Sequence, residues 1–216
     1  MKIAALVSTN GSVLRACLEK TSEEIDFIIV DRECGAEKIA NDFNIPLKRL
    51  EAKGQKEFSE EVFNFLKSNN INYLVLFFSR ILTGELINYY DKKIINFHPS
   101  ILPSHPGVRG FEDSLSSGSL FIGSTVHFVD SGIDSGFQIA QCKSHSFGQD
   151  ETELRHTIFA QQVASLFQVI RSIRKGEFMP EERKIFPELD YLDANSFSCP
   201  IFEEDVNRLY FDILRG

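Results

Sequence analysis

Short apolar runs of strand length alternate with longer amphipathic stretches, and this alternation constrains the fold more than any other feature of the chain. The runs are KIAALVS at the N-terminus, then DFIIVD, YLVLFF and KKIINF, and segments with a helical spacing of apolar residues separate them. A strand followed by a helix and another strand is the βαβ unit of a parallel sheet, whose strands are apolar because helices cover both faces. We therefore predict an α/β fold, a Rossmann-like, mostly parallel central sheet flanked by helices.

The second half of the chain continues with two strand-like runs, FIGSTVHFVD and FQIAQCKSHSF, and then a long helical pattern. Asp150 is expected to cap that helix, which runs to about Arg174. After Gly176 the sequence becomes irregular and acidic until the amphipathic stretch from Val206 to Leu214. We expect a catalytic domain over residues 1–176 and an extension over residues 177–216 that packs on it or lies at an oligomer contact, so both a monomer and a homodimer stay open.

Composition restricts the class of protein. The chain has 216 residues, of which 43% are hydrophobic, and this is enough to bury a core. The formal net charge of -8 argues against nucleic-acid binding, and no apolar run approaches the ~18 residues of a membrane span. The four cysteines are scattered with no Cys-x-x-Cys pair, and the N-terminus resembles a first strand rather than a signal peptide. We expect a cytoplasmic protein without a bound metal that interacts with neither nucleic acid nor membrane.

The stretch INFHPS carries the strongest chemical signal. Strand alternation places Ile95 and Phe97 on one face and Asn96 and His98 on the other, and Pro99 then ends the pairing of the strand. An amide can donate a hydrogen bond to a developing oxyanion, and an imidazole can move a proton near neutral pH. The two side chains together therefore predict a catalytic pair at the end of a strand, although a lone histidine there is also compatible with a structural role.

A carboxylate is a candidate third member of this site. Asp134 lies in the Gly-rich turn DSGIDSG between two strand-like runs, where it can stabilise a protonated His98 and take part in proton transfer. A turn carboxylate that only caps its own backbone is the simpler alternative. Two other sites use the same residues or chemistry: a metal site of His98, His127 and Asp134, and a serine hydrolase, for which no G-x-S-x-G motif is present.

The loop after the first strand, STNGS, is a candidate anion site. It joins a strand to a helix, and the free N–H groups at a helix N-terminus favour a phosphate near Asn10, Gly11 and Ser12. The loop matches neither the G-x-G-x-x-G nor the P-loop pattern. An ordinary turn in which Ser8 or Asn10 caps the helix is an equal alternative.

These motifs together resemble the folate-dependent formyltransferase family. The resemblance depends on N-x-H-P-S at Asn96 to Ser100, on the following LP-x-x-PG, and on Asp134 after STVHFVDSGI, and it extends from Met1 to about Ile173. Within the family the chain is most similar to the branch that formylates phosphoribosylglycinamide in purine biosynthesis.

The resemblance implies a one-carbon transfer in which N10-formyltetrahydrofolate donates a formyl group to a primary amine of a small, phosphorylated substrate. It implies that Asn96 and His98 stabilise the oxyanion while Asp134 fixes His98 and helps move the amine proton. The folate would lie against Ser79, Arg80, Ile81 and Leu82 and against Ser131, Gly132 and Ile133. The amine substrate would contact Asn10, Gly11, Ser12, Pro99 and Gln162.

Three positions depart from the pattern of the purine branch, and all are expected on the acceptor side. Val13 replaces an asparagine, Phe77 replaces a glycine, and Gln162 aligns with a substrate-binding glutamate. A different amine, such as that of an amino sugar nucleotide, is therefore an open alternative. A ligand-binding protein that kept the fold without catalysis is another.

Overall fold

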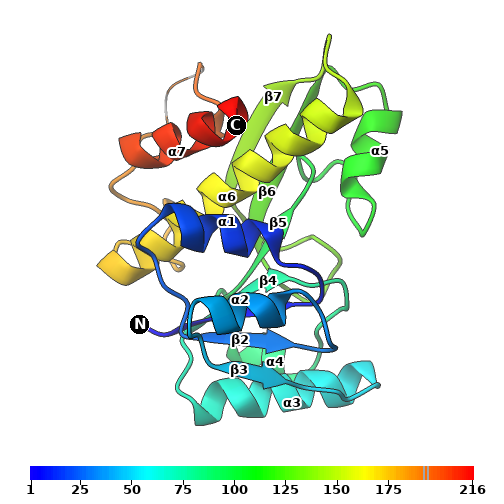
Figure 1. Ribbon diagram of the computed structural model, residues 1–216, viewed down its shortest axis with the longest axis vertical. Coiled ribbons are helices and arrows are strands. Elements are labelled where there is room, and N and C mark those ends of the chain that lie inside the picture. The colour runs from blue at the N-terminus through cyan, green and yellow to red at the C-terminus, as the bar shows by residue number, and fades with distance from the viewer. Residues whose placement is uncertain (192, 194) are drawn as a thin grey trace.

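The computed structural model describes every residue except 192 and 194, and it contains one eight-stranded sheet in the described part of the chain. The strands are β1 (Ile3–Val7), β2 (Phe27–Val30), β3 (Leu47–Arg49), β4 (Tyr73–Phe77), β5 (Ile94–His98), β6 (Phe121–Phe128), β7 (Gln138–His145) and β8 (Ser198–Cys199). The helices are α1 (Ser12–Lys20), α2 (Ala36–Asp42), α3 (Gln55–Ser68), α4 (Glu85–Tyr89), α5 (Gly110–Ser116), α6 (Glu151–Lys175) and α7 (Glu204–Arg215). Figure 1 shows their arrangement.

The strand order is β3-β2-β1-β4-β5-β6-β7-β8. The strands β1 to β5 pair in parallel, whereas β6, β7 and β8 are joined to the edge by antiparallel pairs. The predicted α/β class and mostly parallel sheet are therefore confirmed. The switch from parallel to antiparallel pairing falls at β5, the strand that carries Asn96 and His98.

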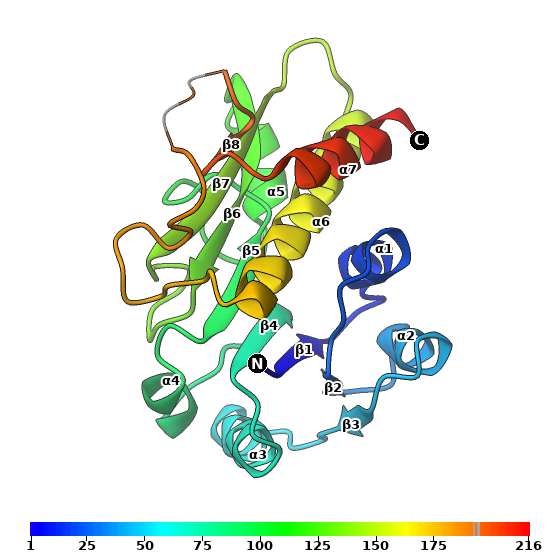
Figure 2. The ribbon, with the colours of Figure 1, turned by 90° about the vertical axis from the view of Figure 1, so that its left-hand side faces the viewer.

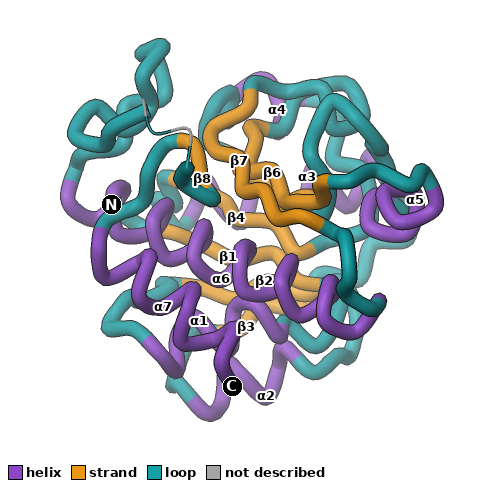
Figure 3. The backbone as a smooth tube through the Cα atoms, turned by 90° about the horizontal axis from the view of Figure 1, so that it is seen from above, coloured by secondary structure: helices purple, strands orange, loops and turns teal. Residues whose placement is uncertain are grey.

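Helices cover both faces of the sheet, as the apolar strands require. Figures 2 and 3 show α1, α2, α6 and α7 on one side of the sheet and α3 and α4 on the other. Alternate residues of β1 take part in the two cores: Ile3, Ala5 and Val7 pack toward α1 and α6, and Ala4 and Leu6 pack toward α3. The period of two along the strand thus supplies both layers with apolar side chains.

The long helix α6 has well-defined ends. The Asp150 side chain accepts a hydrogen bond from the Glu153 N–H at 2.9 Å, and the Glu153 carboxylate accepts one from the Asp150 N–H at 2.8 Å. The predicted cap is therefore confirmed, as a full capping box. Gly176 ends the helix in the left-handed conformation, with φ 76°. Most of the helix is buried between the sheet and its neighbours α1 and α7.

Several described segments after Gly176 pack against the rest of the molecule. Segment 198–199 pairs with β7 as the strand β8, and α7 packs along α6. Phe178, Phe186, Val206 and Tyr210 are buried in the same apolar cluster as the α6 side chains. This segment therefore contributes to the core on the α6 side of the sheet.

Two local features differ from the sequence-based expectation. The stretch TGELINYY predicts a short helix with Thr83 as its N-cap, but the helix after β4 begins at Glu85 and its N-cap residue is Gly84, so the predicted cap is wrong. The backbone N–H of Thr83 instead donates to Ser59 Oγ at 3.0 Å. The strands β3 and β8 were not expected, because β3 consists of three exposed residues and β8 of only two.

Candidate active site

Asn96 and His98 lie at the carboxyl end of β5, where open α/β sheets place their ligands. In the antiparallel pair with β6, Asn96 stands opposite His127 and His98 stands opposite Thr125. Ile95 and Phe97 pack in the core with α6, which confirms the alternation inferred from the sequence. β5 ends at His98, as the following proline predicted.

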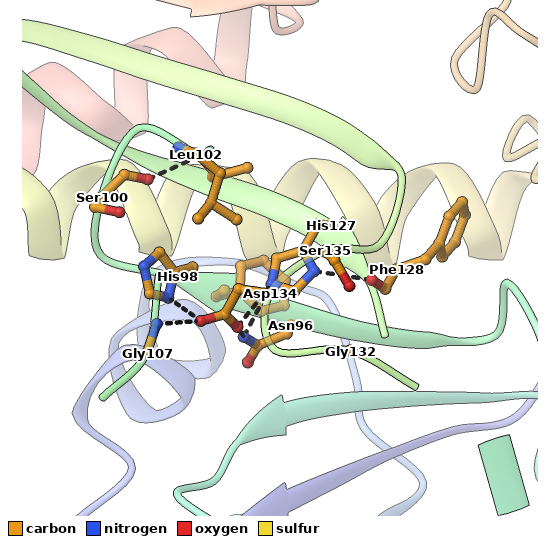
Figure 4. Close-up of polar contacts among 12 residues, drawn as sticks. Asn96, His98, Ser100, Leu102, Gly107, His127, Phe128, Gly132, Asp134 and Ser135 are labelled. Carbon is orange, nitrogen blue, oxygen red and sulfur yellow. Dashed lines mark hydrogen bonds and ion pairs between the residues drawn. The ribbon is translucent and has the colours of Figure 1, made fainter. Parts of the chain in front are cut away.

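Asp134 reaches these two side chains from the turn between β6 and β7 (Figure 4). Its Oδ2 atom lies 3.4 Å from His98 Nδ1 and accepts a hydrogen bond from the Gly107 N–H at 2.7 Å. Its Oδ1 atom lies 3.5 Å from Asn96 Nδ2. Asp134 has a positive φ of 50°, a conformation that aspartate tolerates better than most residues. The structure thus brings the three predicted residues together, and the carboxylate faces the site rather than its own backbone.

A fourth residue, His127, completes the cluster, and sequence reasoning considered it only as a metal ligand. The ring is 2% exposed, and its Nδ1–H donates to the Phe128 carbonyl at 2.8 Å. Its Nε2 atom therefore faces the site, 3.1 Å from Asn96 Nδ2 and 3.5 Å from Asp134 Oδ1. The signal for this role was the pairing of β6 with β5, which the sequence pattern alone does not specify.

The protonation of the site follows from burial and from the facing groups. The His127 ring, the Gly107 N–H and the charge of His98 hold the pKa of Asp134 at about 2 against the cost of burial, so this carboxyl group is ionised at neutral pH. Burial lowers the pKa of His98, and the His105 carbonyl and Asp134 oppose that effect. A buried imidazole beside a permanent carboxylate can accept, hold and return a proton.

These residues form part of the wall of a cavity of about 720 Å³. Every binding residue proposed from the sequence lines the cavity except Asn10 and Ser131, which lie outside its lining. Much of the remaining wall is apolar, including Phe78, Leu82 and Val129. A cavity of this size with a few polar groups suits a small organic ligand.

The segment from Ser79 to Leu82 lines the cavity, and the charged side chain of Arg80 within it is bound to a neighbouring loop. The Arg80 guanidinium donates to the carbonyls of Ala52, Lys53 and Gly54 at 3.1–3.3 Å and lies 4.2 Å from the centre of the Phe58 ring. It also lies 3.7 Å from Asp31 Oδ2. Arg80 therefore anchors the segment to the loop before α3, and the cation is already surrounded by acceptors.

The loop after β1 leaves the N-terminus of α1 open. Gly11 is the N-cap residue, with φ 63°, and no side chain caps the helix, so neither Ser8 nor Asn10 has the capping role considered above. A side chain at residue 11 would also meet Ile39, because an added Cβ would lie 2.8 Å from its Cδ1 atom. Gly11, Ser12 and Val13 line the cavity, so the uncapped N-terminus of α1 lies beside it, and an anion is favoured there.

The three unusual residues on the expected acceptor side all line the cavity. The Phe77 ring stacks on Phe97, with centroids 5.2 Å apart and an angle of 18°. Gln162 donates from Nε2 to the Phe97 carbonyl at 3.0 Å, and Val13 lies in the first turn of α1. These side chains therefore bring apolar surface and a neutral amide to this wall.

Among residues 1–191, 193 and 195–216, no group of three or more His, Cys, Asp or Glu side chains is arranged to hold a metal ion. No helix in the same residues is both long and apolar enough to cross a membrane.

Most of the chain that carries this site matches the model of a known protein family. The family model described as formyl transferase covers residues 1–170 of the chain. The chain belongs to the formyl transferase family. The resemblance seen in the sequence is confirmed, and residues 171–216 lie beyond the part that the family model describes.

Relatives and solved structures give the same result. The chain is 33% identical over 165 residues to the trifunctional purine biosynthetic protein adenosine-3 of Chironomus tentans, an alignment that covers 70% of this chain but only 12% of that protein. It is 30% identical over 163 residues to a phosphoribosylglycinamide formyltransferase of Mycobacterium tuberculosis, covering 72% of this chain and 76% of the relative. The structure of glycinamide ribonucleotide transformylase 1 from Symbiobacterium toebii superposes with a TM-score of 0.77 at 25% identity, covering 85% of this chain and 92% of the other.

Proposed function

We propose that this formyltransferase transfers the formyl group of N10-formyltetrahydrofolate to the primary amine of phosphoribosylglycinamide, a step of purine biosynthesis. The observation that carries the proposal is the convergence of Asn96, His98 and Asp134 on one cavity. The names of the relatives from Mycobacterium tuberculosis and Symbiobacterium toebii support this acceptor. The amine is itself the nucleophile, so the site needs no activated serine or cysteine.

When it is bound, N10-formyltetrahydrofolate supplies the carbonyl carbon that the amine attacks. Asn96 and His98 then stabilise the oxygen that gains negative charge. The second Nδ2 proton of Asn96 is available for this purpose, because its contact with Asp134 is long at 3.5 Å. His98, whose Nδ1 atom faces the ionised Asp134, takes the proton that the amine loses as it forms the new C–N bond. The bond between the formyl carbon and the folate nitrogen then breaks, and that nitrogen receives the proton that His98 returns.

The cavity suits the folate in two respects. Apolar side chains such as Phe78, Leu82 and Val129 offer surface to a flat ring. In the described structure the N–H groups of Arg80, Ile81 and Leu82 have no hydrogen-bond partner, so they can meet the polar edge of such a ring. We assign the folate ring to Ser79–Leu82 and to the turn at Ser131–Ile133, where Ser131 would contribute from outside the cavity wall.

The acceptor then occupies the other end of the cavity. Its phosphate would bind to the open N-terminus of α1 at Gly11 and Ser12, with Asn10 at the edge of the loop. Its amine would lie near His98 and Asp134, between Pro99 and Gln162. This placement of the phosphate needs no lysine or arginine side chain, because backbone N–H groups at the start of α1 supply the hydrogen-bond donors.

Release of tetrahydrofolate in the presence and absence of phosphoribosylglycinamide tests the proposal. Wild-type protein is expected to release it only with the acceptor, and His98→Ala is expected to lose at least about 100-fold in kcat while it still binds folate. Binding without turnover on any amine would refute catalysis and leave a ligand-binding protein on the same fold.

A second acceptor is suggested by the wall around Phe77. The stacked Phe77–Phe97 pair and the Gln162 amide, which is bound to the Phe97 carbonyl, replace small or charged groups expected for the purine branch. These features favour an amine that carries an apolar or neutral group beside the reacting nitrogen. An amino sugar nucleotide is therefore the second substrate to test in the same assay.

A further inference from the structure

We propose that Gly110 is a positioning residue for the reaction: its missing side chain lets the loop that carries the His105 carbonyl close on His98 and fix the orientation of the imidazole. This inference rests on the proposed function, because it assigns a purpose to the orientation of His98. It concerns a residue outside the groups that the mechanism above uses.

The steric evidence is direct. Gly110 is the buried first residue of α5, and a Cβ atom added to it would lie 2.5 Å from His98 Nε2 and 2.8 Å from His98 Cε1. The same atom would lie 3.1 Å from the His105 carbonyl oxygen. Carbon atoms are not found this close to such neighbours, so a side chain at residue 110 requires the ring or the loop to move.

Neither neighbour is free to move without loss. The His98 ring is 3% exposed, with Nε2 donating to the His105 carbonyl at 2.9 Å and Nδ1 facing Asp134 at 3.4 Å. The His105 carbonyl belongs to the backbone, and His105 has a positive φ of 56°. Displacement of either group therefore breaks the hydrogen bond at Nε2, and a rotation of the ring also turns Nδ1 away from the carboxylate.

The loop is fixed to the site by further hydrogen bonds. Ser100, which is fully buried, donates from Oγ to the carbonyls of Ser104 at 2.9 Å and His105 at 3.0 Å. Two residues farther on, the Gly107 N–H donates to Asp134 at 2.7 Å. One loop thus holds both His98 and Asp134, and Gly110 is the point where this loop and the helix α5 leave room for the ring.

The backbone at Gly110 does not itself require glycine. Its φ lies outside the left-handed region, and it occupies a helical position, where alanine is normally preferred to glycine by up to about 1 kcal/mol. Alanine at residue 110 is therefore compatible with the backbone conformation of the helix, but its Cβ atom would clash with the His98 ring. Gly110→Ala should therefore lower kcat much more than it lowers the stability of the fold, and this difference distinguishes a positioning role from a purely structural one.

The test compares Gly110→Ala with Ser116→Ala. Ser116 is an exposed residue at the end of the same helix, and its hydroxyl donates to the Glu112 carbonyl of that helix at 2.8 Å, so its replacement by alanine adds no atom near His98. For Gly110→Ala we expect kcat to fall by about 100-fold, because misplacement by about 1 Å costs that much, while KM for the folate changes less than about three-fold. Ser116→Ala should retain wild-type kcat. A Gly110→Ala enzyme with kcat within about two-fold of wild type would overturn the proposal.

A second readout does not depend on turnover. Nitrogen-15 spectra of the histidine rings report which ring nitrogen carries the proton and whether it is hydrogen-bonded. Wild-type His98 should show a bonded Nε2–H, and Gly110→Ala should lose it; unchanged His98 signals would overturn the proposal even if the wild-type protein transferred no formyl group. If Gly110→Ala fails to fold, Ser100→Ala is tested in its place, because it removes the hydrogen bond to the His105 carbonyl without adding an atom. An unchanged His98 Nε2 signal and an unchanged kcat in Ser100→Ala would equally overturn the inference.

Discussion

Replacement of Asp134 by asparagine removes the charge of this side chain and keeps its size and shape. The carboxyl pKa falls from 3.8 to about 2 because His127, the Gly107 N–H and His98 favour the charged form. At about 1.36 kcal/mol per pKa unit, this difference corresponds to about 2 kcal/mol of folding free energy at neutral pH. The side chain is only 14% exposed, so solvent screens the interaction little. Asparagine also tolerates the positive φ at residue 134.

The sign of the pH dependence follows from the lowered pKa. The unfolded chain takes up the proton near pH 3.8 and the folded chain only near pH 2, so the stabilisation is complete above pH 3.8 and is lost as the pH falls toward 2. Urea unfolding should therefore show Asp134→Asn to be about 2 kcal/mol less stable than wild type at pH 7, with a gap that closes toward pH 2. Its kcat should fall by about 100-fold or more.

The control is Asp113→Asn, which removes the same charge from an exposed pair with Arg109 at 3.5 Å and should change stability by less than about 0.5 kcal/mol. An Asp134→Asn protein as stable as wild type at pH 7 would refute the reasoning. A stability gap that stays constant down to pH 3 would refute it as well, because the effect would then not arise from ionisation.

Two further predictions concern the helix α6 and the C-terminal segment that packs against it. Asp150→Ala removes the capping box of α6 and should lower the free energy of unfolding by about 1 kcal/mol in urea; an unchanged midpoint would show that the cap is not needed. A chain that ends at Gly176 loses Phe178, Phe186, Val206 and their neighbours from the core on the α6 side. We expect it to show no sharp thermal transition by circular dichroism, whereas a wild-type-like transition would establish residues 1–176 as an independent domain.

The sequence was most informative where a local pattern decides the structure. The strands β1, β2 and β4 are apolar on both faces, and a strand of this kind is typical of a parallel sheet that helices cover on both sides. β3 was not foreseen because its three residues are exposed and include Lys48 and Arg49, so pairing with β2 alone makes it a strand. The ends of α6 were foreseeable because Asp150 and Gly176 act through their immediate neighbours.

In the candidate site as well, the sequence predicts what depends on local pattern and misses what depends on contacts between distant segments. Asn96 and His98 share a face because alternation along one strand places them there. His127 was assigned no catalytic role, because its position opposite Asn96 depends on the register of β6 against β5, and β6 has an irregularity at Val126/His127 in its pairing with β7. The position of Gly110 against the His98 ring is likewise a distance between separate segments, and residue spacing gives no indication of it.

Transfer of a carbon-13-labelled formyl group gives the most direct test of the central claim. Labelled N10-formyltetrahydrofolate is incubated with phosphoribosylglycinamide and either wild-type protein or His98→Ala, and the labelled product is identified by mass spectrometry and NMR. The account predicts the label on the amine nitrogen of the acceptor with wild-type protein, and at least about 100-fold less with His98→Ala. Equal labelling by the two proteins, or none by wild type with this or any other amine, would contradict it.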